Sequence, residues 1–245
     1  LHRPLRGRDE VVRARVLVAD SLTQIGPQAP ALLFVNSPSN PTGQVLGVDH
    51  LRKLVGWARE RGVIVASDEC YLGLGWDAEP VSVLHPSVSG GDHTGVLAVH
   101  SLSKRSNLAG YRAGFVAGDP RLVAGLLEAR KHAGLILPEP VQAAATAAYA
   151  DDAHVAEQRA RYADRRALLR PVLEKVGFTV EHSEAGLYLW ATRGRDSWQA
   201  VAELAELGVL VAPGAFYGPA GERHVRIALT ATDERVAAAA ERLGA

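Results

Sequence analysis

Residues 95–104 read GVLAVHSLSK and join a short apolar run to a turn that carries two hydroxyls and a lysine. The run is short enough for a buried strand, which we expect over 95–100. Lys104 is therefore expected just past the end of a strand, where open α/β sheets place their ligands. Arg112 follows in the same polar stretch. An amine beside hydroxyls and a guanidinium suits a Schiff-base lysine next to a phosphate clamp, but the same residues also fit an ordinary solvated turn.

Two apolar runs further upstream, 31–36 and 63–68, are expected to be neighbouring strands. Between them, apolar residues recur at helical spacing, at positions 51, 54, 55 and 58. This spacing predicts a helix that Asp49 caps at its start and that ends at Gly62. Strand, helix and strand in this order imply a right-handed crossover, and hence a parallel sheet that is buried on both faces. Two weaker strands are expected, at 16–18 and 111–117.

Beyond the turn that carries Lys104, helices and short strands are expected to alternate. The helices are expected at 119–132, 138–150, 152–176, 197–207 and 232–243. The strands are expected at 178–182, 186–192, 209–212 and 225–229. Because strands alternate with helices in shorter segments here than in the first part of the chain, we expect a smaller α/β or α+β domain. The fold class is therefore α/β, with a mostly parallel sheet in a major domain over residues 1–137, and interdomain helices and a minor domain over residues 138–245.

Composition excludes several classes of protein and partner. The chain has 245 residues, of which 47% are hydrophobic and 22% charged, enough for a large core. Lys plus Arg and Asp plus Glu both number 27, so nothing indicates a nucleic acid or an anionic membrane as partner. Cys70 is the single cysteine, which rules out an internal disulfide and fits a reducing cytoplasm. The apolar runs are too short to span a membrane, and the histidines lack metal-ligand spacing, so we assign no metal.

Three polar residues lie in informative surroundings, and each has an ordinary alternative. Asp68 ends an apolar run, where a carboxylate is costly unless it meets a cation, although a helix cap or a salt bridge explains it as well. Asn40 lies in a PSNPTG turn, where it either forms the turn or donates from its side chain to a ligand. Arg226, in the run VRIAL, is either a strand-edge arginine or a bidentate carboxylate receptor. Tyr188 and Trp190 alternate in a strand and are interpreted first as core.

Four motifs stand in a fixed order along the chain: NPTG at 40–43, SDECY at 67–71, SLSK at 101–104 with Arg112, and Arg226. The same order occurs in fold-type I, class I and II aminotransferases, which use pyridoxal 5′-phosphate (PLP), and the chain resembles that family from about residue 16 to its end. Within the family it is most similar to actinobacterial N-succinyldiaminopimelate aminotransferases. The stretches that carry this closer resemblance are 36–43, 67–76, 185–190, 213–219 and 228–233.

The resemblance implies catalytic roles for three residues. Lys104 would form the covalent link to the cofactor's aldehyde and would move a proton between substrate and cofactor. Asp68 would pair with the pyridinium nitrogen. Tyr71, together with Asn40, would hydrogen-bond the ring oxygen.

The resemblance also implies how anionic groups would be held. Ser101, Ser103 and Arg112 would bind the cofactor's phosphate, with Arg112 the strongest because it is always charged and can contact two oxygens. Arg226 would bind the substrate α-carboxylate, and Asn40 is also expected to bind substrate. The family places part of the strand that carries Tyr188 and Trp190 near the substrate, and Phe216 and Tyr217 are expected in a loop near the site.

The function implied in this way is transamination of N-succinyl-LL-2,6-diaminopimelate with 2-oxoglutarate, in lysine and diaminopimelate biosynthesis in the cytoplasm. Two alternatives lie within the same fold: an aromatic or alanine aminotransferase, and a carbon–sulfur β-lyase. A further alternative is an inactive fragment or a non-enzymatic PLP-fold regulatory domain.

The chain contains no methionine, so Leu1 is not an unprocessed translation start, and we expect an N-terminally truncated protein. The resemblance implies that an N-terminal segment, a glycine-containing helix start that binds phosphate, and an aromatic ring over the pyridine are missing. A homodimer is therefore expected of the intact family member rather than of this chain.

Overall fold

The computed structural model describes residues 15–16 and 30–244. Its first sheet has five strands in sequence order: β1 (Arg15–Val16), β2 (Leu32–Asn36), β3 (Ile64–Asp68), β4 (Val96–Ser101) and β5 (Gly114–Gly118). The first four are parallel and β5 is antiparallel to β4. The mostly parallel α/β sheet is thus confirmed, and of the strand expected at 16–18, residues 17 and 18 lie outside the described residues.

The crossover between β2 and β3 is the helix α1 (Val48–Glu60). Its buried side chains recur at helical spacing and pack on the sheet: Leu51, Leu54, Val55 and Ala58. The helix ends as predicted, because Gly62 adopts a left-handed φ of 64° and its N–H bonds to the carbonyl of Arg59.

The predicted cap of α1 is wrong. Gly47 occupies the N-cap position and offers no side chain, while Asp49 lies inside the first turn. There its carboxylate pairs with Arg52 at 2.7 Å. An acid in the first turn still favours the helix through its dipole, which is why the sequence signal resembled a cap.

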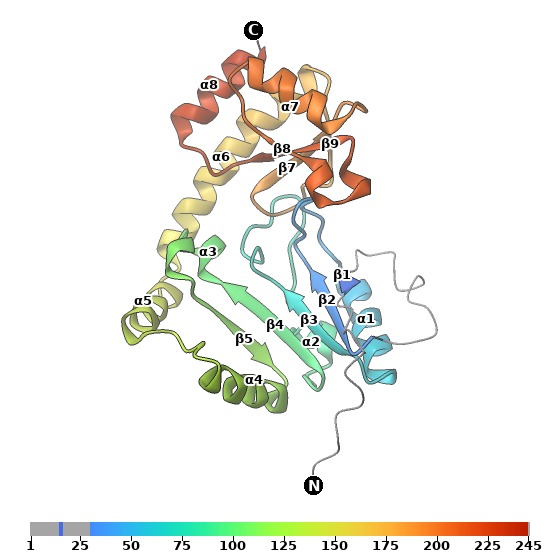
Figure 1. Cartoon of the computed structure of the whole chain (residues 1–245), viewed down its shortest axis with the longest axis vertical. Coiled ribbons are helices and arrows are strands. Elements are labelled where there is room, and N and C mark those ends of the chain that lie inside the picture. Colours follow the sequence, from blue (N-terminus) through green and yellow to red (C-terminus); the bar gives the residue numbers. More distant parts are fainter. Residues whose placement is uncertain (1–14, 17–29, 245) are drawn as a thin grey trace.

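The region that follows β4 departs from a sheet buried on both faces. Residues 109–111 form a 3₁₀ turn, η2 (Ala109–Tyr111), so β5 begins later than predicted. The side chains of Phe115 and Val116 on β5 are exposed. The next two helices, α4 (Pro120–His132) and α5 (Glu139–Tyr149), have no buried residue, and Figure 1 shows them at the outer side of this sheet.

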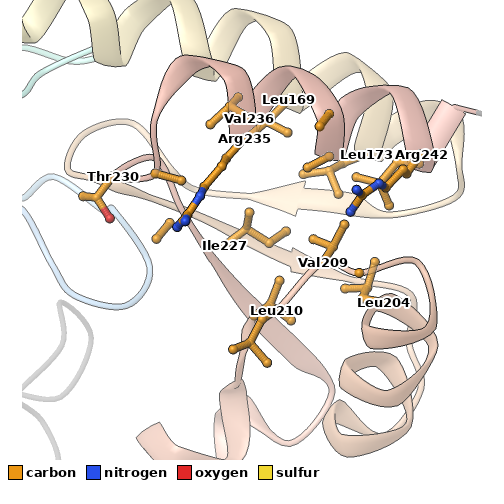
Figure 2. Close-up of a pocket in the computed structure, with 17 residues that line it drawn as sticks. Leu169, Leu173, Leu204, Val209, Leu210, Ile227, Thr230, Arg235, Val236 and Arg242 are labelled. Atoms are coloured by element: carbon orange, nitrogen blue, oxygen red, sulfur yellow. The ribbon is translucent and has the colours of Figure 1, made fainter.

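The second sheet is antiparallel and has the order β6 (Thr179–Glu181), β7 (Tyr188–Thr192), β9 (His224–Ala228), β8 (Ala212–Pro213). The helices α6 (Ala153–Lys175), α7 (Ser197–Glu206) and α8 (Asp233–Gly244) accompany it. Its core is apolar and includes Leu173, Leu189 and Leu229. A cavity of about 630 Å³ lies under α8, with Arg235 and Arg242 beside an apolar floor (Figure 2).

The remaining elements are short. They are α2 (Pro86–Ser89), α3 (Leu102–Arg105), and the 3₁₀ turns η3 (Gly214–Tyr217) and η4 (Pro219–Gly221). Within the described ranges, no helix combines the length and the apolar character that crossing a membrane requires.

Residues 183–186 join the two sheets. The N–H of Ser183 bonds to the carbonyl of Thr42 (2.8 Å), and the N–H of Ala185 to the carbonyl of Gly43 (3.0 Å). On the other side, the N–H of Gly186 bonds to the carbonyl of Leu74 (2.8 Å). The turn that carries Asn40 and the segment that follows Asp68 are therefore both held against the chain entering β7.

Candidate functional site

The carboxyl ends of three parallel strands meet at one edge of the first sheet. β2 ends at Asn36, β3 at Asp68 and β4 at Ser101, and the pairing places Asn36 opposite Asp68 and Asp68 opposite Val99. Figure 1 shows β2 and β3 pointing toward the second sheet. This edge is where open parallel sheets bind ligands.

Asp68 and Lys104 both act on the thiol of Cys70. The Asp68 carboxylate accepts a hydrogen bond from the Cys70 N–H at 3.1 Å. Burial and, after it, the negative charge of Asp68 raise the pKa of the Cys70 thiol to about 12, although the ammonium of Lys104 acts in the opposite direction. The predicted acid and the predicted amine therefore lie within electrostatic reach of the same atom.

The segment that carries Lys104 is the single helical turn α3, which a serine caps at its start. Ser101 is the N-cap of α3 and its hydroxyl accepts the N–H of Ser103 at 3.1 Å. Leu102 is buried beneath the turn, and Arg105 donates to the carbonyl of Ala148 at 2.6 Å. These contacts anchor the turn on both sides of Lys104, which is half-buried.

Arg112 lies apart from this group. It adopts a left-handed conformation, with φ of 54°, and its side chain is exposed. Its guanidinium donates to the carbonyl of Ala109 at 3.1 Å. In the described residues no hydrogen bond or ion pair joins it to Ser101, Ser103 or Lys104, so its assignment to a phosphate stays a prediction.

Arg226 brings together residues from three distant parts of the chain. Its Nη1 donates to the Oδ1 of Asn40 at 3.0 Å. Its guanidinium carbon lies 3.9 Å from the ring centroid of Tyr188 and 5.2 Å from that of Tyr217. The hydroxyl of Tyr71 in turn donates to that of Tyr188 at 3.4 Å. Asn40, Tyr71 and Arg226, which we predicted separately, thus form one cluster.

Of the aromatic residues in this cluster, Tyr217 was expected near the site, but no contact of Tyr188 was predicted. Tyr188 was interpreted first as core, whereas it is half-buried and lies between Tyr71 and Arg226. Trp190 fits that interpretation, since it is buried and stacks on His224 with centroids 4.8 Å apart. The alternating pattern could not separate the two, because both project from the same face of β7.

His100 packs at the end of β4. Its ring stacks on Phe115 with centroids 4.8 Å apart, and its Nε2 lies 3.3 Å from the carboxylate of Glu69. Glu69 is only 1% exposed and its other oxygen accepts the N–H of Val83 at 2.7 Å.

Within the described ranges, no group of three or more His, Cys, Asp or Glu side chains could hold a metal ion.

The sequence matches the protein family described as aminotransferase class I and II over residues 16–243. The chain belongs to this family. It is 72% identical over 229 residues to the probable aminotransferase Rv1178 of Mycobacterium tuberculosis, covering 94% of this chain and 55% of that protein. It is 62% identical over 230 residues to 4-dedimethylamino-4-oxo-anhydrotetracycline transaminase OxyQ of Streptomyces rimosus, covering 94% of this chain and 64% of that protein. The chain therefore spans less than two thirds of the length of either relative.

A solved aminotransferase has the same fold. The chain superimposes with a TM-score of 0.82 on N-succinyldiaminopimelate aminotransferase from Mycobacterium tuberculosis, at 28% identity, covering 95% of this chain and 62% of that one. Class I and II aminotransferases depend on PLP. The family, the α/β fold and the cofactor class predicted from the motifs are thereby confirmed.

The residues of this aminotransferase-family chain fit that cofactor in their donor set. PLP presents a basic ring nitrogen, a ring oxygen, an aldehyde and a phosphate, which call for an acid, neutral donors, an amine and anion-binding groups. Asp68 accepts the N–H of Cys70, and the charge of Lys104 acts on the thiol of the same residue. The phenol of Tyr71 contacts Tyr188, and the amide of Asn40 contacts Arg226. Burial and the hydrogen bond to Tyr188 raise the pKa of Tyr71, so its phenol stays protonated and able to donate.

Proposed function

We propose that the protein is a PLP-dependent aminotransferase that moves an amino group between an amino acid and a 2-oxo acid. Membership of the family supports this proposal, and one observation carries it in this chain. The guanidinium of Arg226 has a single protein partner on Nη1, while its Nε is buried without any partner in the described residues. A buried unpaired donor costs about 1–3 kcal/mol, so the arrangement favours a bound carboxylate, which amino acids and 2-oxo acids share.

The finer proposal is that the amino donor is N-succinyl-LL-2,6-diaminopimelate and the acceptor 2-oxoglutarate, in lysine biosynthesis. The motif resemblance supports it, as does the likeness to a solved N-succinyldiaminopimelate aminotransferase. A second candidate is an oxo group on a larger ring system, because the 62% identical relative OxyQ is named as a transaminase of an oxo-anhydrotetracycline.

Each site residue has a task that follows from its chemistry. When bound, PLP supplies an electron sink that stabilises negative charge at the substrate Cα. Asp68 would hold a proton on the ring nitrogen, and Tyr71 and Asn40 would donate to the ring oxygen. Lys104 would remove the proton from the substrate Cα as a base and would then deliver it, as an acid, to the C4′ carbon of the cofactor. Arg226 would fix the carboxylate so that Cα lies within reach of that amine.

Phosphate binding is assigned to Ser101, Ser103 and Arg112. The capped turn supports the two serines, because Ser101 holds the backbone of Ser103 in place. The division of the chain at residues 137 and 138 is also part of the proposal, as is a cytoplasmic location. Enzymes of this family are typically dimers, so a homodimer is proposed for the intact family member rather than for this chain.

The test is turnover by the purified protein supplied with PLP and 2-oxoglutarate, with four amino donors compared side by side. The donors are N-succinyl-LL-2,6-diaminopimelate, LL-diaminopimelate, alanine and tyrosine. Glutamate formation with any of them supports an aminotransferase, and a clear preference for the first supports the finer proposal. An Arg226→Ala variant should raise KM for both substrates more than it changes kcat, because it removes a contact to the carboxylate that both carry. Unchanged KM values would contradict the role of Arg226.

A further inference from the structure

We infer that Tyr188 is a positioning residue that sets the plane of the Arg226 guanidinium and links it to Tyr71. The inference rests on the proposed function and deepens it, because it says how the carboxylate receptor and the cofactor-facing phenol are held in one arrangement.

The geometry at Arg226 shows what fixes its side chain. β7 and β9 are antiparallel neighbours in which Trp190 lies opposite Arg226 and Tyr188 opposite Ala228, so Tyr188 and Arg226 are diagonal on one face of the sheet. The guanidinium carbon lies 3.9 Å from the Tyr188 centroid, well inside the range of a cation–π contact. Tyr217, at 5.2 Å, is a more distant neighbour of the same charge.

The guanidinium has one protein hydrogen bond with which to orient itself. Nη1 donates to Asn40, and Nε is buried with no partner in the described part of the chain. A single hydrogen bond leaves the plane free to rotate, so contact with the Tyr188 ring is what fixes it. Nε and Nη2 make no hydrogen bond to the described residues, and the fork that they form matches the two oxygens of a carboxylate.

The other end of Tyr188 faces Tyr71. The two hydroxyls are 3.4 Å apart, and the rings meet edge to face with centroids 6.1 Å apart and an interplanar angle of 70°. Tyr71 is 3% exposed, so this contact takes the place of water around its hydroxyl. Tyr188 therefore touches the carboxylate receptor with its ring and the cofactor-facing phenol with its hydroxyl.

The experiment distinguishes the role of the Tyr188 ring from that of its hydroxyl. Calorimetry measures the equilibrium binding of maleate, an unreactive dicarboxylate, to the protein without PLP. Tyr188→Leu should weaken binding roughly tenfold, because the guanidinium loses its stacking partner. Tyr188→Phe keeps the ring and should retain most of the affinity. Tyr217→Leu is the matched control, and its loss should be clearly smaller because its ring is more distant.

A second substitution keeps the inference testable if Tyr188→Leu unfolds, as checked by near-ultraviolet circular dichroism. Pentafluorophenylalanine at position 188 preserves the shape of phenylalanine but withdraws electrons from the ring face. It should bind maleate more weakly than Tyr188→Phe if the cation–π contact is the cause. Equal affinities for these two variants would overturn the inference.

The link to Tyr71 is tested by a double-mutant cycle on PLP affinity, measured by equilibrium dialysis. If the two hydroxyls act together, Tyr71→Phe with Tyr188→Phe should cost no more than Tyr71→Phe alone. Additive losses would overturn the link. Failure of the unmutated protein to bind maleate would refute the carboxylate site itself, and the inference with it. Binding that Tyr188→Leu leaves intact would refute the inference alone.

Discussion

At the scale of single residues, the pKa of the Cys70 thiol responds to the charges of Asp68 and Lys104. This thiol follows the strand that ends at Asp68 and feels the ammonium of Lys104 from the next strand end. The two charges have opposite effects on the same ionisation. Because Cys70 is the only cysteine in the chain, its reactivity can be measured without interference.

We predict that the alkylation rate of Cys70 by iodoacetamide at pH 9 responds with opposite signs to two substitutions. Asp68→Asn removes a negative charge that raises the thiol pKa, so more thiolate forms and the rate increases. Lys104→Ala removes the positive charge that lowers the pKa, so the rate decreases. Lys131→Ala, a lysine on α4, is the control and should leave the rate unchanged. Changes of the same sign for the first two variants would show that these side chains do not share one site.

The residues that the sequence identified were those with a motif around them. Asn40, Tyr71 and Arg226 lie far apart in the chain, and their motifs gave each a role before their contacts were known. Tyr188 lies in the stretch 185–190 that carries the resemblance, but an aromatic residue in an alternating strand looks the same whether its face meets the core or a ligand. The contacts of Tyr188 with Arg226 and Tyr71 distinguish the two.

At the scale of elements, the turn that carries Asn40 depends on one glycine. Gly43 has a φ of 72°, and a Cβ there would lie 2.6 Å from the carbonyl oxygen of Ala185 and 2.8 Å from the Cα of Ser183. The close approach is what lets the turn bond to the chain entering β7. A side chain at this position would therefore push the turn away from the second sheet.

Gly43→Ala should lower the free energy of unfolding by about 1–3 kcal/mol, since it adds backbone strain and a steric clash. Urea denaturation followed by tryptophan fluorescence measures this. Gly56→Ala, inside α1 where a Cβ meets nothing within 4 Å, is the control. It should stabilise the protein by about 0.5–1 kcal/mol because alanine favours a helix. A stable Gly43→Ala protein would argue against the close contact between turn and strand.

Asp119 connects the start of α4 to the start of β4. Its carboxylate accepts the N–H of Gly95 at 2.8 Å, and also caps α4 through the N–H groups of Arg121 and Leu122. The hydrogen bond from Gly95 lowers the pKa of Asp119, and those from α4 add to the effect. Since the folded pKa is below the unfolded one, the stabilisation is present above the unfolded pKa and is lost as the pH falls through the folded pKa.

Asp119→Asn should therefore reduce stability at neutral pH and flatten the dependence of stability on pH in the acid range. Unfolding by urea at a series of pH values between neutrality and the carboxylate range measures both effects. Asp152→Asn, an exposed acid just before α6, is the control and should have a smaller effect. A parallel pH profile for Asp119→Asn and the unmutated protein would contradict the assignment.

The helices and strands were largely predictable from the sequence. The spacing of apolar residues indicates the kind of element, and proline and glycine mark where an element begins or ends. The helix at 119–132 begins at the proline that follows Asp119, and α1 ends before Gly62. The direction of β5 was not predictable, because periodicity encodes which face is buried and not which way a strand runs. Asp49 was misplaced because a cap and a first-turn acid have the same residue preference.

At the scale of the whole molecule, the surface of β5 and α4 stands out. Phe115, Leu126 and Leu127 are 43%, 42% and 47% exposed, and β5 is an edge strand with an open side in the described sheet. Exposed apolar side chains beside an open edge favour pairing with another chain. We predict that the purified 245-residue chain self-associates through this surface.

Replacing Leu126 and Leu127 together with Glu should shift the protein toward the monomer, as measured by light scattering over a range of concentrations. Two charges on α4 would oppose burial of that surface. Leu210→Glu is the matched control, because Leu210 is 88% exposed but lies near the second sheet. The proposal about β5 and α4 would be wrong if Leu210→Glu dissociated the protein and the α4 variant did not.

The central claim is that Lys104 is the amine that bonds covalently to PLP. The chain has four lysines, Lys53, Lys104, Lys131 and Lys175, which makes the attachment site easy to assign. The decisive measurement is borohydride reduction of the protein mixed with PLP, followed by peptide mass spectrometry. Our account predicts a reduced PLP adduct on the peptide that contains Lys104, and its loss in Lys104→Arg but not in Lys131→Arg. An adduct spread over the other three lysines, or its persistence in Lys104→Arg, would contradict it.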